Sequence, residues 1–188
     1  MSNPDRFPGD PPVPQPVPAP VVHATRQGAV LVVRIDNPPV NALGAAVRQG
    51  LLQALDQAAA DADVHALLIV GEGRAFIGGA DIREFGQPAL PPSLPEVCKR
   101  IEASDKIVVA ALHGPALGGG LEVALAAHYR VALPAATLGL PEVTLGLLPG
   151  AGGTQRAPRL MGARAAAELM LGGQPLSCLL YTSPSPRD

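Results

Sequence analysis

The sequence predicts an α/β fold in which short buried strands lead through glycine-rich loops into helices. In one of the two stretches that carry this prediction, the apolar run 107–112 leads into the glycine-rich segment 113–120 and a helix-forming segment, 121–127. In the other, the apolar run 66–70 leads into the glycine-rich segment 71–80. Such runs are typical of buried parallel strands. Because parallel strands place their carboxyl-end loops on one side of a sheet, we expect the two loops to be neighbours.

The two ends of the chain differ in composition from the rest. Residues 1–20 are rich in proline, which favours an extended, solvated conformation that builds no core. Residues 177–188 break with the alanine-rich style of the preceding chain and resemble translated vector sequence. We therefore expect a disordered lead over 1–20, one folded domain over 21–176 and a non-native tail over 177–188.

The segment before the first glycine-rich loop predicts a strand followed by a helix. Residues 29–35 are mostly apolar and are followed by Asn37-Pro38-Pro39, which ends a strand. Asn41 is a candidate helix cap. Beyond it, an apolar residue recurs every four positions, as on the buried face of a helix. These residues are Leu43, Val47, Leu51 and Leu55.

The remaining elements are predicted from shorter patterns. After the loop at 71–80, a helix start is expected at Asp81, followed by an irregular proline-rich connection. The later expected elements are a helix over 93–103, a strand over 129–133, an extended segment over 137–140, and two short helices over 155–160 and 164–171.

Composition narrows the class of protein. The chain has 188 residues, of which 47% are hydrophobic and 16% charged, and its formal net charge is −2. With no basic stripe, nucleic acid is not expected as a partner. No apolar run reaches the roughly 18 residues that a membrane helix needs, so no membrane association is expected. The two cysteines, Cys98 and Cys178, lack metal-type spacing, so we expect no metal site and a cytoplasmic protein.

The two glycine-rich loops also predict a catalytic site. Backbone N–H donors are expected near Ala80 and at Gly119, where a helix begins, and carboxylates follow at Glu122 and Glu142. Two amides from separate loops suit an oxyanion hole, and two carboxylates suit general acid–base catalysis. The glycines could instead serve only a tight turn, and the acids could be ordinary helix and loop residues. Their apolar surroundings favour function, because a buried carboxylate without a partner is costly.

Three motifs resemble the crotonase superfamily, the enoyl-CoA hydratases and isomerases. They lie at 75–84, 113–122 and 139–156, and the resemblance covers 21–176. The chain is most similar to the hydratase/isomerase part of multifunctional fatty-acid oxidation proteins, in which a 3-hydroxyacyl-CoA dehydrogenase region follows. The resemblance implies a crotonase (ClpP-like) spiral of β-β-α repeats. The C-terminal helices that cover the site in this family, and that often form trimers or hexamers, would lie beyond residue 176 and are expected to be missing.

The resemblance also implies catalytic roles. The amides of Ala80 and Gly119 would bind the thioester oxygen, and Glu122 and Glu142 would flank a water molecule. Glu122 would activate that water for attack on C3, and Glu142 would deliver a proton to C2. Gly150 would help to place the water through its backbone. Retention of both acids favours hydration, with double-bond isomerisation possible on the same acids.

Substrate contacts are implied in the same way. Gly78 would contact the CoA base through its main chain, and Arg74 and Arg83 lie where the family often has basic residues near the CoA phosphates. CoA is part of the substrate, and no cofactor is expected. The first hypothesis is thus hydration of a 2-trans-enoyl-CoA in fatty-acid β-oxidation. An isomerase of the same fold and an inactive fragment that binds CoA thioesters stay as alternatives.

Overall fold

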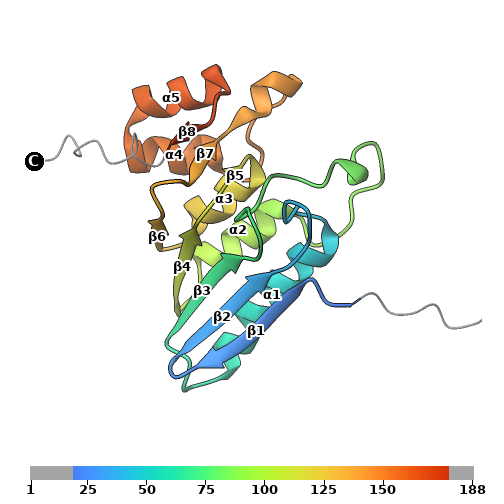
Figure 1. Ribbon diagram of the computed structural model, residues 1–188, viewed down its shortest axis with the longest axis vertical. Coiled ribbons are helices and arrows are strands. Elements are labelled where there is room, and N and C mark those ends of the chain that lie inside the picture. Colours follow the sequence, from blue (N-terminus) through green and yellow to red (C-terminus); the bar gives the residue numbers. More distant parts are fainter. Residues whose placement is uncertain (1–18, 178–188) are drawn as a thin grey trace, which may run out of the picture.

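The computed structural model describes residues 19–177, which form two β-sheets with helices packed around them (Figure 1). The strands are β1 (Val22–Gln27), β2 (Val30–Ile35), β3 (Ala66–Gly71), β4 (Ile107–Leu112), β5 (Ala116–Leu117), β6 (Tyr129–Ala132), β7 (Thr137–Gly139) and β8 (Leu176–Ser177). The helices are α1 (Ala45–Ala60), α2 (Leu94–Glu102), α3 (Gly119–Ala126), α4 (Gly153–Met161) and α5 (Ala163–Gly172), with short 3₁₀ helices η1 (Ile82–Glu84) and η2 (Pro141–Leu145).

The larger sheet confirms the predicted α/β class. Its strand order is β1-β2-β3-β4-β6, and every neighbouring pair except β1 and β2 is parallel. The four parallel strands correspond to the apolar runs predicted as strands. β1 had no such signal, because it lies at the sheet edge and most of its side chains are polar and exposed. Its backbone therefore pairs with β2 without a marked apolar pattern in its sequence.

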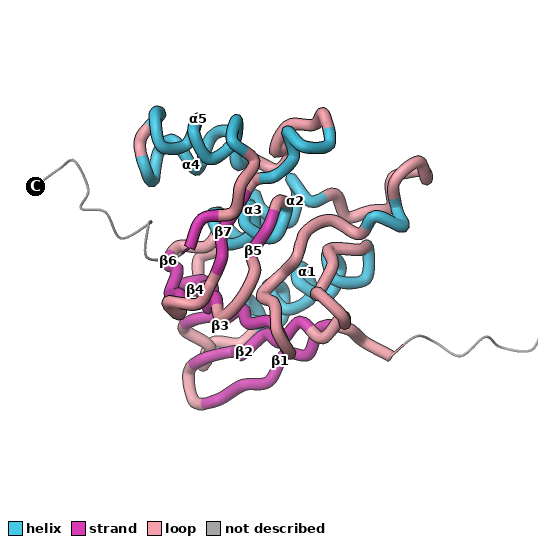
Figure 2. The backbone as a smooth tube through the Cα atoms, turned by 45° about the horizontal axis from the view of Figure 1, so that its top comes forward, coloured by secondary structure: helices cyan, strands magenta, loops and turns pink. Residues whose placement is uncertain are grey.

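Helices cover one face of the larger sheet (Figure 2). α1 packs against β1, β2 and β3, and α2 packs against both α1 and α3. The predicted apolar stripe is buried at all four positions, but Leu43 precedes the helix, which begins at Ala45, so the stripe on α1 itself consists of Val47, Leu51 and Leu55. They face core side chains of β2 and β3 that include Leu31, Val33 and Ile69. Burial of each such side chain contributes about 1.5–3 kcal/mol.

The second sheet gives the fold its repeat. β5 runs parallel to β7, and β7 pairs antiparallel with β8. Because β4, β5 and α3 follow one another, and β6, β7 and α4 follow in the same sequence, the chain repeats a strand–strand–helix unit, in which each unit adds one strand to each sheet. The implied spiral of β-β-α repeats is therefore present.

Asn41 does not cap the first helix, and that prediction is wrong. α1 begins at Ala45 with Gly44 at its cap position. Asn41 is instead 2% exposed and adopts a left-handed backbone conformation with a φ of 55°, which asparagine tolerates better than most residues. Its amide nitrogen donates to the carbonyls of Glu72 and Ala75, each at 2.9 Å. The Asn41 side chain thus bonds to residues more than 30 positions away in the sequence rather than to the start of the next helix.

The remaining surface features concern the ends of the chain and its charge. The predicted lead and tail lie outside the described residues apart from their inner ends, where Ser177 pairs with Thr137.

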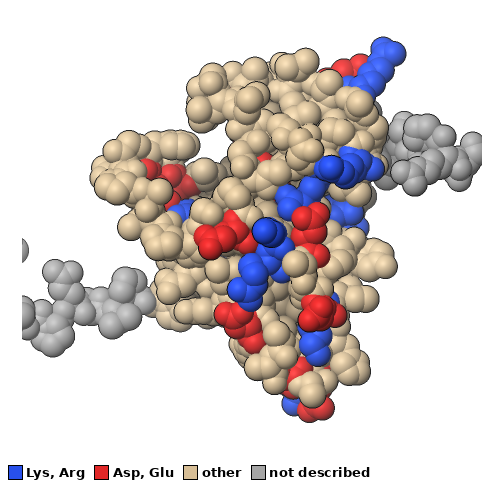
Figure 3. Space-filling model, turned by 180° about the vertical axis from the view of Figure 1, so that it is seen from behind, with Lys and Arg blue, Asp and Glu red and all other residues tan. Residues whose placement is uncertain are grey.

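On the face seen in Figure 3, Lys and Arg side chains lie among those of Asp and Glu. Within residues 19–177, no helix is both long and apolar enough to span a bilayer. The same residues contain no cluster of His, Cys, Asp and Glu suited to a metal ion.

Candidate active site

The two glycine-rich loops lie against each other, as predicted. The amide of Leu117 donates to the carbonyl of Ile77 at 3.0 Å, and the amides of Phe76 and Ile77 both donate to the carbonyl of Pro115. A Cβ atom on Gly120 would lie 2.2 Å from the Ile77 oxygen, so only glycine permits this approach. The loop junction, defined as residues 76–80 with 115–120, therefore depends on backbone contacts that a side chain would separate.

Two amides at this junction are free to bind a ligand. Gly119 is the first residue of α3, so its N–H has no partner within the helix. Among the hydrogen bonds of residues 19–177, none is donated by the amide of Ala80 or of Gly119. Leu43 connects the two positions, because it forms a parallel bridge with Ala80 and its side chain lies against Gly119. Donors from two separate loops thus lie on either side of Leu43, and an oxyanion hole uses two donors of this kind.

Glu122 is the first acid of the site and lies in the first turn of α3. The residue is 2% exposed. Its Oε1 atom accepts from the amides of Ala151 at 2.7 Å and Gly153 at 2.8 Å. Burial raises the pKa of Glu122, and the two amides and the charge of Arg156 only partly oppose that rise. The turn that precedes α4 therefore fixes one oxygen of a carboxyl group whose proton affinity is increased.

Glu142 is the second acid and belongs to η2. Its Oε1 atom would be 3.2 Å from a Cβ atom on Gly118, so the carboxyl group lies at the start of α3. Its Oε2 atom is buried and has no hydrogen-bond partner among the described residues. Burial raises the pKa of Glu142, and the negative charge of Glu122 raises it further. An unpaired buried acceptor costs about 1–3 kcal/mol, which favours a chemical role over a structural one.

The other predicted site residues are placed less directly. Gly150 is exposed, and the amides that hold Glu122 are those of Ala151 and Gly153 rather than that of Gly150. The amide of Gly78 is already bonded to the carbonyl of Val40 at 2.8 Å. Arg74 and Arg83 are exposed. The guanidinium of Arg83 is paired with Asp81, with Nη2 and Oδ2 2.7 Å apart.

A cavity of about 570 Å³ adjoins the Ala80 side of the junction. Its walls include Ala80, Leu43 and Leu94, together with residues 84–91 of the loop that follows η1. The two acids are not among its lining residues and lie on the Gly118–Gly119 side. The junction thus has acids on one side and a mainly apolar hollow on the other.

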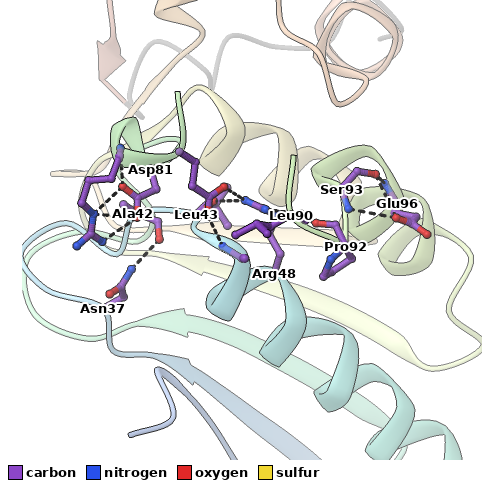
Figure 4. Close-up of polar contacts among 12 residues, drawn as sticks. Asn37, Ala42, Leu43, Arg48, Asp81, Leu90, Pro92, Ser93 and Glu96 are labelled. Carbon is purple, nitrogen blue, oxygen red and sulfur yellow. Dashed lines mark hydrogen bonds and ion pairs between the residues drawn. The ribbon is translucent and has the colours of Figure 1, made fainter. Parts of the chain in front are cut away.

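Arg48 holds the wall of this cavity, a role that the sequence analysis missed (Figure 4). Its guanidinium donates to the carbonyls of Leu43, Leu90 and Pro92 at 2.6–2.9 Å. It also pairs with Glu84, with Nη1 and Oε2 2.8 Å apart. The sequence does contain a signal for Arg48, which is its position in the helix. Arg48 lies three and seven residues before Leu51 and Leu55 of the apolar stripe, so it projects from the buried side of α1. A charge on such a face indicates a buried partner.

Comparison with known proteins identifies the family to which this sequence is similar. Residues 25–178 match the family described as enoyl-CoA hydratase/isomerase. A peroxisomal bifunctional enzyme of Danio rerio is 53% identical over 149 residues, which are 79% of this chain and 21% of that protein. A probable enoyl-CoA hydratase of Bacillus subtilis (strain 168) is 46% identical over 155 residues, which are 79% of this chain and 60% of that protein.

Solved structures show the same fold. An enoyl-CoA hydratase from Bacillus anthracis superposes with a TM-score of 0.80 at 32% identity, over 85% of this chain and 66% of that chain. An enoyl-CoA hydratase subunit from Geobacillus kaustophilus superposes with a TM-score of 0.78 at 36% identity, over 85% of this chain and 64% of that chain. This chain spans less than two thirds of the length of each relative named here.

Proposed function

This chain belongs to the enoyl-CoA hydratase/isomerase family, and from that premise we propose that it hydrates a 2-trans-enoyl-CoA in fatty-acid β-oxidation. The observation that carries the proposal is the placement of two acids, the buried Glu122 and the half-buried Glu142, beside the first turn of α3, next to two amides that have no acceptor among residues 19–177. Hydration of a conjugated thioester needs these groups, because water adds to C3, a proton adds to C2, and the thioester oxygen bears the negative charge in between. Each part of the site corresponds to one of these requirements.

The amides of Ala80 and Gly119 would hold the thioester oxygen. Both are donors without a protein acceptor among residues 19–177, and the positive end of the α3 dipole lies at Gly119. They would bind more strongly as negative charge develops on that oxygen, and removal of one such donor typically lowers the rate about 10²–10³-fold. This half of the site would therefore stabilise the enolate.

The two acids would share one proton. Glu122 has two amide donors on one oxygen, which favour its carboxylate, whereas Glu142 has a buried oxygen with no donor among the described residues, which favours its protonated form. Glu122 would take a proton from water as the water oxygen bonds to C3, and Glu142 would give its proton to C2. Transfer of a proton from Glu122 back to Glu142 would then restore the starting state.

CoA would enter as part of the substrate. Because hydration transfers no electrons to an external acceptor, the proposal includes no redox cofactor. Gly78 would contact the adenine through its carbonyl, since its amide is bonded to Val40. Arg74 and Arg83 would lie near the phosphates, with Arg83 leaving Asp81 to do so. Gly150 would assist the water through its backbone.

The assay is the hydration of crotonyl-CoA, followed by the loss of absorbance of the conjugated thioester. Glu122→Gln and Glu142→Gln should each abolish hydration, because each removes one proton-transfer step. Glu168→Gln is the matched control, since that acid is exposed on α5 and pairs only with Arg164 among the described residues. Full activity in either site variant would refute the acid–base roles.

The alternatives predict different results in the same assay. An isomerase would convert a 3-enoyl-CoA and would survive the loss of one acid. A fragment that only binds CoA thioesters would show no turnover with either substrate.

We also propose a further region of the natural protein and a compartment from the names of the relatives. Because relatives carry the names bifunctional and multifunctional enzyme, we propose that a 3-hydroxyacyl-CoA dehydrogenase region follows in the natural gene, which sequencing of the locus beyond the codon for Leu176 would test. The same relatives are named peroxisomal, so a peroxisomal location stands beside the predicted cytoplasmic one, and cell fractionation would distinguish them.

A further inference from the structure

A buried arginine lies behind the turn that holds Glu122. Arg156 is on α4, and its side chain is 13% exposed. Its Nη1 atom donates to the carbonyl of Ala151 at 2.8 Å. Its Nε and Nη2 atoms donate to the two carboxylate oxygens of Glu102 on α2, at 3.2 and 2.8 Å. The guanidinium thus connects the end of α2 to the turn before α4 by three hydrogen bonds.

The same turn supplies both amides that bind Glu122. The Ala151 residue is held at its carbonyl by Arg156 and at its amide by Glu122. The amide of Gly153, two residues later, binds the same carboxylate oxygen. Between them, Gly152 has a φ of 100°, and a Cβ atom there would lie 2.2 Å from Nη1 of Arg156. The guanidinium therefore lies directly against the turn and fixes its path.

We infer that Arg156 is a positioning residue for the acid Glu122: it holds the turn 151–153 so that two amides converge on one oxygen of that acid. Glu102 anchors Arg156 in turn, because its two oxygens accept from Nε and Nη2 of the guanidinium. The inference depends on the proposed function only for the statement that Glu122 is the catalytic base. The geometry of the turn is independent of the reaction.

The charges around Glu122 make the inference measurable. The titratable groups that interact with it are Cys98 from α2, Glu142 from η2 and Arg156 from α4. Glu102 of α2 bonds to Arg156, and Arg130 of β6 bonds to carbonyls at the far end of α3. Arg156 is the cation among these that lowers the pKa of Glu122. Removing it takes away a positive charge and loosens two amide donors, and both changes favour the protonated acid.

The test compares variants of the full chain by carboxyl ¹³C NMR with labelled glutamate. The Glu122 signal is assigned from its absence in Glu122→Gln. In Arg156→Gln the titration midpoint of Glu122 should rise. In Arg156→Lys the rise should be smaller, because lysine keeps the charge but cannot form the same fork of hydrogen bonds. Arg159→Gln is the matched control on α4, where the arginine bonds only to Gln155 among the described residues, and it should leave the midpoint unchanged.

The activity readout separates positioning from substrate binding. In Arg156→Gln, kcat for crotonyl-CoA hydration should fall by about tenfold to a hundredfold, with a smaller change in KM, as expected when a catalytic group is displaced. If Arg156→Gln does not fold, Arg156→Lys carries the test and should still raise the midpoint, because lysine keeps the charge but loses the fork of hydrogen bonds.

Two results would overturn different statements. An unchanged Glu122 midpoint in the folded Arg156→Gln variant, or in Arg156→Lys where the first does not fold, refutes the positioning role. A wild-type chain that hydrates no enoyl-CoA refutes the proposed function, while the NMR titration still decides the role of Arg156.

Discussion

Replacing Arg48 with methionine should destabilise the protein by about 3 kcal/mol. Methionine keeps the apolar stem but removes a guanidinium whose side chain is 9% exposed and which donates to three carbonyls and to Glu84. Breaking a buried ion pair from one side costs about 3–5 kcal/mol. The lower end applies here, because Glu84 is 30% exposed and keeps its bond to the Ala45 amide. The carbonyl of Leu90, on an exposed residue, can also rebind water.

Urea unfolding measures this effect. For a slope of about 2 kcal/mol per molar urea, a loss of 3 kcal/mol lowers the midpoint by about 1.5 M. Arg100→Met is the matched control, since Arg100 pairs with Asp56 on the surface and such pairs contribute about 0–1 kcal/mol. A midpoint for Arg48→Met that equals the control would refute the claim that Arg48 holds the cavity wall. Arg48→Met should also weaken substrate binding, because Arg48 bonds to Glu84 and Leu90, and residues 84–91 line the cavity.

Two further predictions concern the acids and the loop junction. The pKa values of Glu122 and Glu142 are both raised. Since Glu122 must be ionised, kcat should fall as the pH decreases through its elevated pKa, and since Glu142 must be protonated, kcat should fall again as the pH rises through its elevated pKa. A pH profile of kcat with no limb above the ordinary glutamate range would contradict this. Gly120→Ala places a Cβ atom 2.2 Å from the Ile77 oxygen. It should destabilise the protein by more than about 1–3 kcal/mol, which is the usual effect of overpacking. A urea midpoint equal to that of wild type would show that the loop junction can relax.

The acids could be predicted from sequence because their signal is local. Each is surrounded in the chain by apolar residues, and the glycine run before Glu122 indicates a helix start with free amides. The central parallel strands β3 and β4 could be predicted for the same reason, since each is a continuous apolar run. Local patterns of this kind predict which residues are buried, and an acid among them requires an explanation.

The partners of the supporting residues could not be predicted because they are distant in the sequence. Arg48 and Glu84 are 36 positions apart, and Arg156 and Glu102 are 54 apart. Asn41 was misassigned as a helix cap because a cap is the local use of asparagine, whereas its observed bonds reach carbonyls 31 and 34 positions away. No pattern within a single helix or loop distinguishes these uses, so only the assembled fold assigns them.

The arrangement of arginines also suits the proposed chemistry. Among residues 19–177, neither Glu122 nor Glu142 forms a salt bridge, although both are in buried surroundings. A guanidinium in direct contact with Glu122 would hold its pKa low and weaken it as a base. Arg156 instead acts through the backbone of Ala151, so orientation comes from amides while burial keeps the proton affinity high. The fold can therefore fix the base firmly without making it a weak one.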